Sequence, residues 1–223
     1  MEGDTGEVIL EFGPHLNHRM TPCSTFKVVL CLMGFDSGLL KNSESPVWNF
    51  QEEYVAYLDS WKMPQTPSSW IKNSCLWYSQ LLAQQLGLET IQKYLKAFGY
   101  GNQDFSGGLT KAWLSSSLEI SPREQVGFIQ KLVRGELPIT KEAAQCTRSF
   151  LFLDHLPEGW KLFGKTGLGN VERGQIGWCV GWIEKGQKCF VFAYCIQGDQ
   201  IQADQRIPRE KQLIKLAREC KSP

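Results

Sequence analysis

The stretch TPCSTFKVVLCLM, residues 21–33, decides the fold of this chain. It opens with Thr21 and Pro22, which are typical of a helix start, and continues into a run that is apolar on nearly every side. A helix of this kind is buried all round, so we expect it in the middle of the molecule. At its start Ser24 and Lys27 stand three positions apart, which places the hydroxyl and the amine on one face. A nucleophile and its base are therefore built into one element.

Outside this helix, the sequence divides into a short N-terminal strand, a helical region and a C-terminal block of strands. Residues 7–12 (EVILEF) are apolar enough for a strand, which Gly13 and Pro14 then end. The region from about 24 to 150 is helical in pattern, with clear helix start or stop signals around 77–87, 88–99 and 121–135. The last third predicts strands at 160–166, 175–184 and 188–197, and then a closing helix at 208–220.

These elements predict an α+β fold with an antiparallel sheet assembled from both chain ends. The helical region lies between the N-terminal strand and the C-terminal strands. A chain of 223 residues with 42% apolar residues can bury a substantial core. Because no repeat or linker divides the sequence, we expect residues 1–223 to form a single domain.

Composition argues against several classes of partner. The 24 basic and 23 acidic residues leave a formal charge of +1, which gives no electrostatic reason to expect nucleic acid or a membrane surface. No apolar run is long enough to span a bilayer. The first residues lack the basic start and apolar centre of a secretory signal, so both a cytosolic protein and a mature form fit the sequence.

The 8 cysteines and 3 histidines show no spacing typical of a metal site. There is no CxxC pair, and the HxxH of His15 and His18 has no further ligands nearby. Most cysteines lie in apolar segments, which favours buried free thiols that act as small hydrophobic side chains. We therefore expect no metal.

Five short motifs follow one another along the chain. They are Ser24-Thr25-Phe26-Lys27, Ser74-Cys75-Leu76, Tyr100-Gly101-Asn102, Trp113-Leu114 and Lys165-Thr166-Gly167. In their order and separation the chain resembles the class D (oxacillinase-type) serine β-lactamases. The resemblance implies the three-layer αβα fold of serine β-lactamases and penicillin-binding transpeptidases. It also implies hydrolysis of a small-molecule β-lactam, a role in antibiotic resistance, and residence in the bacterial periplasm.

Ser24 is the expected nucleophile, because acyl transfer needs a hydroxyl beside a base. Lys27 would be protonated in water, so it must be desolvated or chemically altered before it can accept a proton. The resemblance implies that carbon dioxide converts Lys27 into a carbamate, an anionic base, and that the indole N–H of Trp113 donates to it. Simple core packing is the other interpretation of Trp113.

Ser74 and the Lys165-Thr166-Gly167 motif receive their roles from the same resemblance. Ser74 would relay a proton to the leaving nitrogen, with an N-cap role as the alternative. Lys165 would supply positive charge, and the hydroxyl of Thr166 would bind the substrate carboxylate. Gly167 would let the substrate approach the backbone of an edge strand.

Two backbone amides and one arginine complete the expected site. The N–H of Leu168 and that of Ser24 would form an oxyanion hole. Arg209 is the better match to the arginine that binds the substrate carboxylate in the family, and Arg206 is close enough in register to be the alternative. The turn at Tyr100-Gly101-Asn102 is interpreted as architectural rather than chemical.

Two departures from the family pattern have consequences. Leu76 stands where the family usually has valine, next to the expected carbamate, and its larger side chain would slow deacylation. Only 23 residues precede Ser24, so we expect an initial strand of the family to be missing. An unpaired sheet edge would then favour self-association, with a homodimer as one outcome.

Two other classes of protein share these motifs. In β-lactam sensor domains the acyl-enzyme persists as a signal, and penicillin-binding transpeptidases act on peptidoglycan. Sensors are normally joined to membrane segments, and the Trp113-Leu114 context favours the hydrolase. The sequence therefore predicts a hydrolase, with a slowly deacylating sensor or penicillin-binding domain as the alternative.

Overall fold

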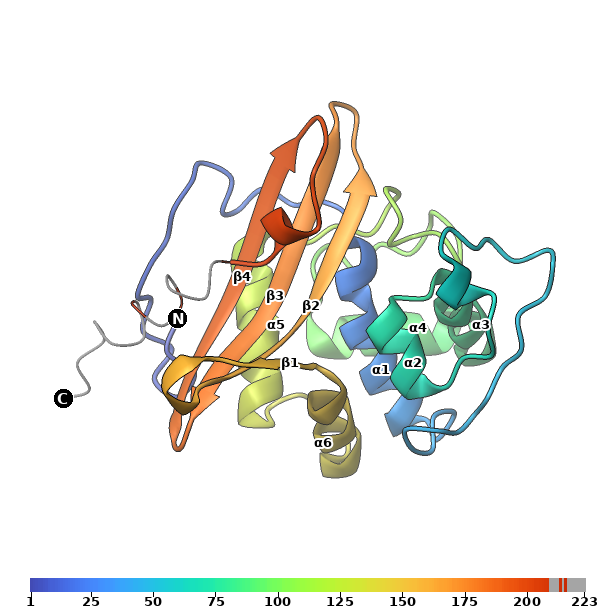
Figure 1. Cartoon of the computed structure of the whole chain (residues 1–223), viewed down its shortest axis with the longest axis horizontal. Helices are drawn as coiled ribbons and strands as arrows, with labels where there is room; N and C mark the ends of the chain where they lie inside the picture. Colours follow the sequence, from blue (N-terminus) through green and yellow to red (C-terminus); the bar gives the residue numbers. More distant parts are fainter. Residues whose placement is uncertain (209–212, 214, 216–223) are drawn as a thin grey trace.

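The computed structural model describes residues 1–208, 213 and 215. Its sheet has four antiparallel strands in the order β1-β2-β3-β4, with the helices packed against one face (Figure 1). The strands are β1 (Phe152–His155), β2 (Lys161–Asn170), β3 (Gln175–Lys185) and β4 (Lys188–Gly198). The predicted α+β class is confirmed.

Six α-helices are present in the described residues, together with four short 3-10 turns. The helices are α1 (Lys27–Asp36), α2 (Pro67–Asn73), α3 (Leu76–Leu86), α4 (Leu88–Phe98), α5 (Pro122–Arg134) and α6 (Lys141–Phe150). The 3-10 turns are η1 (Cys23–Phe26), η2 (Asp59–Trp61), η3 (Pro157–Gly159) and η4 (Asp204–Arg206).

Helix α1 runs through the middle of the molecule, as its all-round apolar sequence predicts. Six consecutive residues, Val28 to Met33, are each at most 1% exposed. Helices α3 and α6 contact α1, and η1 at its start contacts β2. Because η1 leads directly into α1, the position of Ser24 is fixed by the best-buried helix of the protein.

Capping residues explain where the other predicted helices begin and end. Helix α5 starts with a capping box, in which Ser121 and Glu124 exchange side-chain and backbone hydrogen bonds. It ends at Gly135, whose φ of 70° is left-handed. Gly87 and Gly99 likewise end α3 and α4. The predicted helices at 77–87, 88–99 and 121–135 are therefore confirmed within one residue at each end.

The predicted C-terminal strands are also confirmed. Strands β3 and β4 are paired along their whole length from Gln175 to Lys185, and a two-residue turn with Gly186 at φ 58° joins them. Strand β2 continues to Asn170, four residues beyond the predicted end at 166. The short strand β1 was not expected from the sequence.

The predicted strand at 7–12 is wrong. These residues pair with no strand, and Val8, Leu10 and Phe12 are 49%, 57% and 89% exposed. The N-terminal contribution to the sheet comes instead from residues 1–3, which lie along the outer edge of β4 (Figure 1). The Gly3 amide donates to the Cys189 carbonyl at 2.7 Å. An apolar hexapeptide alone does not make a strand when a neighbouring segment already occupies the sheet edge.

Both faces of the sheet are covered by apolar packing. The larger cluster joins α1, the helices around it and the inward-facing Trp178, Val180 and Trp182 of β3. A smaller cluster lies on the opposite face and includes Ile183 and Leu213. Layers of apolar contacts therefore lie on both sides of the sheet, in keeping with the αβα expectation. Most of the predicted closing helix at 208–220 lies outside the described residues.

Asp36, the last residue of α1, ties that helix to two others. One carboxylate oxygen accepts from the Thr140 amide before α6, and the other accepts from the Tyr94 hydroxyl of α4, both at 2.7 Å. Partial burial acts to raise the pKa of Asp36, but these hydrogen bonds outweigh it and hold the pKa below the usual 3.8. The ionised form is therefore the one that stabilises the fold.

We predict that Asp36→Ala lowers the free energy of unfolding at neutral pH by about 1–2 kcal/mol. Because the folded-state pKa is depressed, this stability is present above pH 3.8 and is lost as the pH falls through the folded-state pKa. Urea denaturation of both proteins at neutral and acidic pH measures the difference. Glu89→Ala, which removes only an exposed ion pair with Lys93, is the control and should be nearly neutral. An equal difference between wild type and Asp36→Ala at both pH values would contradict the prediction.

Candidate active site

Ser24 and Lys27 lie side by side at the junction of η1 and α1. The Lys27 Nζ atom donates to the Ser24 Oγ atom at 3.3 Å. Lys27 is only 1% exposed, whereas Ser24 is half-buried and therefore reachable from outside. In a 3-10 turn, residues i and i+3 are eclipsed, which brings the two side chains together. The predicted pairing of hydroxyl and amine on one face is present.

Burial changes the acidity of Lys27. Loss of solvation lowers the pKa of its amine to about 7, and the charge of Lys165 lowers it further. A sizeable fraction of the amine is therefore neutral at physiological pH. A neutral amine is both a proton acceptor and a nucleophile toward carbon dioxide.

Strand β2 passes directly beside the nucleophile. A Cβ atom on Gly167 would lie 3.3 Å from the Ser24 nitrogen and 3.2 Å from the Pro22 carbonyl oxygen. These contacts are tighter than most Cβ contacts, so a side chain at this position would require the turn that carries Ser24 to shift by a few tenths of an ångström. Glycine at 167 thus permits close approach of strand and turn. Its predicted role, which is to let the substrate approach the strand backbone, stays a prediction.

The backbone N–H of Leu168 points away from β3, toward the side of β2 on which β1 pairs. The Gly164 amide donates to the Leu151 carbonyl on the β1 side of β2. Because alternate N–H groups of a strand point the same way, those of Thr166 and Leu168 also face this side, beyond the last residue paired with β1. This direction, with Ser24 packed beside Gly167, agrees with the expected pair of oxyanion donors.

A group of cations lies around this edge of the sheet. Lys165 is 5% exposed, and its amine donates to the Thr166 carbonyl at 3.1 Å. Burial lowers the pKa of Lys165 to about 8, and the charge of Arg206 lowers it further. Among the described residues, no ion pair with a carboxylate involves Lys27, Lys165 or Arg206. Cations without a carboxylate partner are suited to bind an incoming anion.

Arg206, the alternative arginine of the sequence, lies over the outer face of β3. Its Cγ atom would be 3.0 Å from a Cβ on Gly177. The strand alternation places Thr166 on this same face, because it pairs with Cys179, two residues from Gly177. The Nε atom of Arg206 is buried and has no hydrogen-bond partner. Arg209, the preferred candidate, lies outside the described residues.

Trp113 is fully buried and stacks on Phe26, with ring centroids 5.3 Å apart. Its carbonyl accepts from the Cys23 amide at 3.1 Å, so the Trp113 loop is joined to the turn of the nucleophile. The indole Nε1 is buried without a hydrogen-bond partner. Core packing accounts for the ring but not for this unpaired donor, since buried indole N–H groups normally find an acceptor.

Ser74 ends α2 and directly precedes Cys75, the N-cap of α3. Its backbone is left-handed, with φ 53° and ψ 36°. Its hydroxyl is buried and has no partner. The alternative N-cap role is therefore wrong, because the α3 N-cap is Cys75 and no side chain caps that helix. Leu76, the first residue of α3, is half-buried.

The turn at Tyr100-Gly101-Asn102 is held by its own hydrogen bonds. Asn102 donates to the Ser117 carbonyl at 2.7 Å and accepts from the Glu119 amide at 3.0 Å. The Tyr100 ring packs edge-on against Phe128, with centroids 5.0 Å apart. These contacts support the architectural interpretation.

Thr21 is a site-organising residue that the sequence analysis missed. Its hydroxyl donates to the Trp113 carbonyl and accepts from the Ser115 amide, both at 2.9 Å. Its carbonyl accepts from the Trp178 indole of β3 at 3.0 Å. Thr21 thus joins three parts of the site. Its place three residues before Ser24 was the only signal that the sequence offered.

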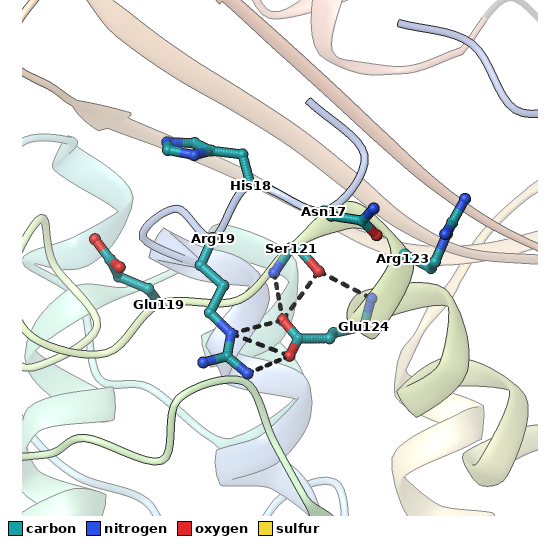
Figure 2. A pocket seen from close by; sticks show the side chains of 7 residues that line it. All are labelled: Asn17, His18, Arg19, Glu119, Ser121, Arg123 and Glu124. Atoms are coloured by element: carbon teal, nitrogen blue, oxygen red, sulfur yellow. Dashed lines mark hydrogen bonds and ion pairs between the residues drawn. The ribbon is translucent and has the colours of Figure 1, made fainter. Parts of the chain in front are cut away.

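The open depression of about 620 Å³ drawn in Figure 2 lies elsewhere. It is built around the ion pair of Arg19 with Glu124, whose shortest contact is 2.6 Å. None of the predicted site residues lines it. An exposed ion pair already satisfied in this way offers little to a ligand.

The described part of the chain offers neither a metal-binding cluster nor a membrane-spanning helix. Its histidines, cysteines and acidic residues form no cluster of three or more that would hold a metal ion. The described helices are too short or too polar to cross a membrane. The seven described cysteines are free thiols, and five of them are buried.

Comparisons with known proteins agree with this geometry. The family model of the penicillin-binding protein transpeptidase domain matches residues 11–215. β-Lactamase OXA-9 of Klebsiella pneumoniae is 40% identical over 205 residues, which cover 85% of this chain and 74% of OXA-9. The regulatory protein BlaR1 of Bacillus licheniformis is 34% identical over 185 residues, which cover 82% of this chain but only 30% of BlaR1.

A solved structure gives the same answer at the level of the fold. The crystal structure of OXA-427, a class D β-lactamase, superposes with a TM-score of 0.84 at 38% sequence identity. The match covers 92% of this chain and 93% of OXA-427. The chain therefore belongs to the class D serine β-lactamases, hydrolases within the family of penicillin-binding protein transpeptidase domains.

Proposed function

We propose that this chain is a periplasmic enzyme that hydrolyses penicillin-type antibiotics through an acyl-enzyme on Ser24, with carboxylated Lys27 as the general base. The observation that carries the proposal is the buried Lys27 amine, 3.3 Å from the Ser24 hydroxyl. A base that is buried from solvent next to a hydroxyl can activate this weak nucleophile. Such an activity would confer resistance to the antibiotics it destroys.

Acylation assigns one task to each residue around the nucleophile. The Lys27 side chain takes the proton of Ser24, and Oγ attacks the carbonyl carbon of the β-lactam. The backbone N–H groups of Ser24 and Leu168 stabilise the negative charge on the carbonyl oxygen. As the carbon–nitrogen bond breaks, the Ser74 hydroxyl gives its proton to the leaving nitrogen and receives in return the proton that the Lys27 side chain took from Ser24, so that an ester to Ser24 and a free amine remain.

A carboxylated Lys27 fits the residues present. The amine is buried among apolar side chains, which favour the neutral form that reacts with carbon dioxide. The buried indole N–H of Trp113, stacked on the neighbouring Phe26, lacks an acceptor that a carbamate oxygen would supply. When formed, the carbamate supplies an anionic base in place of the amine.

The cation-rich edge of the sheet suits the carboxylate of a penicillin. Lys165 and Arg206 provide positive charge, and Thr166 provides a hydroxyl from β2, the strand that also carries Lys165 and contacts the turn of the nucleophile. Charge-assisted hydrogen bonds of this type are roughly twice as strong as neutral ones. The same contacts would orient the β-lactam carbonyl toward the oxyanion donors.

Deacylation distinguishes the hydrolase from the alternative function. Water must reach the ester beside Leu76, whose side chain is larger than the family's usual valine. The similarity to part of BlaR1 and this residue together favour, as the second candidate, a domain that acylates but deacylates slowly. Turnover after the first acylation separates the two.

The central test compares wild type with Ser24→Ala and Lys27→Ala in the hydrolysis of a chromogenic cephalosporin. We expect multiple turnovers by wild type and a loss of at least about a thousandfold in either variant, because nucleophile and base act as a unit. Intact mass should show a transient adduct on wild type and none on Ser24→Ala. A wild-type adduct that persists without turnover would favour the sensor, and unchanged rates in Ser24→Ala would refute both functions.

A second prediction concerns pH. Since the pKa of Lys27 is lowered to about 7, the amine becomes protonated as the pH falls through that value and no longer reacts with carbon dioxide. Activity should therefore fall on the acid side, and added bicarbonate should restore part of it. Initial rates on both sides of pH 7, with and without bicarbonate, measure this. An acid limb that bicarbonate leaves unchanged would contradict the carbamate.

A third prediction is that Ser74→Ala is more stable but less active than wild type. The substitution removes a buried hydroxyl without a partner, which should raise the free energy of unfolding by about 1 kcal/mol. Loss of the proton relay should lower the acylation rate by roughly a hundredfold. Ser79→Ala is the control, because that buried hydroxyl accepts from Trp70 Nε1 at 2.8 Å and its loss should destabilise. Equal destabilisation by both substitutions, measured in urea, would count against a functional Ser74.

A further inference from the structure

Ser74 stands at the corner between α2 and α3, and one loop residue touches both helices. The Trp61 Nε1 atom donates to the carbonyl of Asn73, the last residue of α2, at 2.8 Å. The Trp61 carbonyl accepts from the Nε1 atom of Trp77, in the first turn of α3, also at 2.8 Å. Trp61 is 8% exposed and Trp77 is 1% exposed, so both bonds are shielded from water. The turn η2 therefore braces both sides of Ser74.

Gln65 reinforces this brace with every polar atom of its side chain. Its Nε2 atom donates to the carbonyls of Ser60 at 2.7 Å and Met63 at 3.0 Å. Its Oε1 atom accepts from Asn73 Nδ2 at 3.2 Å. Because carbonyl oxygens only accept, the two bonds from Nε2 fix the orientation of the amide. Gln65 is 1% exposed, and its backbone pairs in both directions with that of Trp48.

The corner that this loop braces is costly to maintain. The backbone of Ser74 is left-handed at φ 53°, a conformation that residues other than glycine and asparagine seldom adopt. Its hydroxyl is buried without a partner and so is held by no hydrogen bond of its own. Strained residues of this kind persist only where the surroundings over-determine them. The two bonds to Asn73 and the one from Trp77 are such surroundings.

We infer that Gln65 and Trp61 are positioning residues that aim the Ser74 hydroxyl at the leaving nitrogen of the β-lactam. The inference rests on the proposed function and adds to it a specific structural origin for the geometry of Ser74. Neither residue touches the reacting atoms. Both act through Asn73, whose carbonyl and side chain are held by two different residues of the same loop.

The test measures acylation separately from turnover. In single-turnover stopped-flow with a chromogenic cephalosporin, Gln65→Met should acylate roughly tenfold more slowly or worse, within the range that positioned proton transfer contributes. In a Ser74→Ala background the same substitution should have no further effect, since the hydroxyl it positions is gone. Additive effects, or a wild-type acylation rate in folded Gln65→Met, would overturn the inference.

Two further variants keep the test decisive. Leu95→Ala truncates a fully buried residue of α4 and lowers stability without touching the loop, and it should acylate at the wild-type rate. A parallel fall in this control would mean that Gln65 acts through stability alone. If Gln65→Met does not fold, Trp61→Phe removes the indole donor together with part of the ring, and it should show the same slow acylation. If wild type forms no adduct on Ser24, the proposed function itself is refuted. If Gln65→Met acylates at the wild-type rate, only the positioning role is refuted and the proposed function stands.

Discussion

The burial of the Lys27 amine beside the Ser24 hydroxyl is the constraint on which the rest of the structure depends. Taking an ammonium out of water is costly, and here no carboxylate among the described ion pairs compensates for it. Burial therefore lowers the pKa of the amine to about 7, so that a sizeable fraction of it is neutral at physiological pH. The all-round apolar α1 creates this environment. The same helix that anchors the core therefore also prepares the base of the reaction.

The second requirement is that separate segments meet around that amine in a fixed geometry. Gly167 lets β2 approach the nucleophile, and Thr21 links the nucleophile turn to the Trp113 loop and to β3. Backbone strain accumulates at the same place. Cys23 and Ser115, with φ values of 51° and 52°, are both left-handed and both flank the site. Together with Ser74 they show local stability given up to hold functional groups in position.

Much of the fold followed from local signals in the sequence. The glycines after α3, α4 and α5, the Ser-Pro start of α5 and the two-residue hairpin turn each act within a few residues, so they could be recognised. The strand at 7–12 failed because sheet pairing is decided by competition between distant segments. Ser24, Lys27 and Gly167 could be placed from their motifs, and the structure brings them together. The left-handed Ser74, the unpaired Trp113 indole and the contacts of Thr21 and Gln65 depend on long-range packing that has no local signature.

The state of Lys27 can be observed directly by carbon-13 NMR of the protein supplied with labelled bicarbonate. We predict one protein-bound carbamate signal at neutral pH, retained in Ser24→Ala and absent in Lys27→Ala. It should weaken in Trp113→Phe, which removes the indole donor but keeps most of the ring. A wild-type spectrum without this signal at saturating bicarbonate, from protein that still turns over β-lactams, would contradict the account.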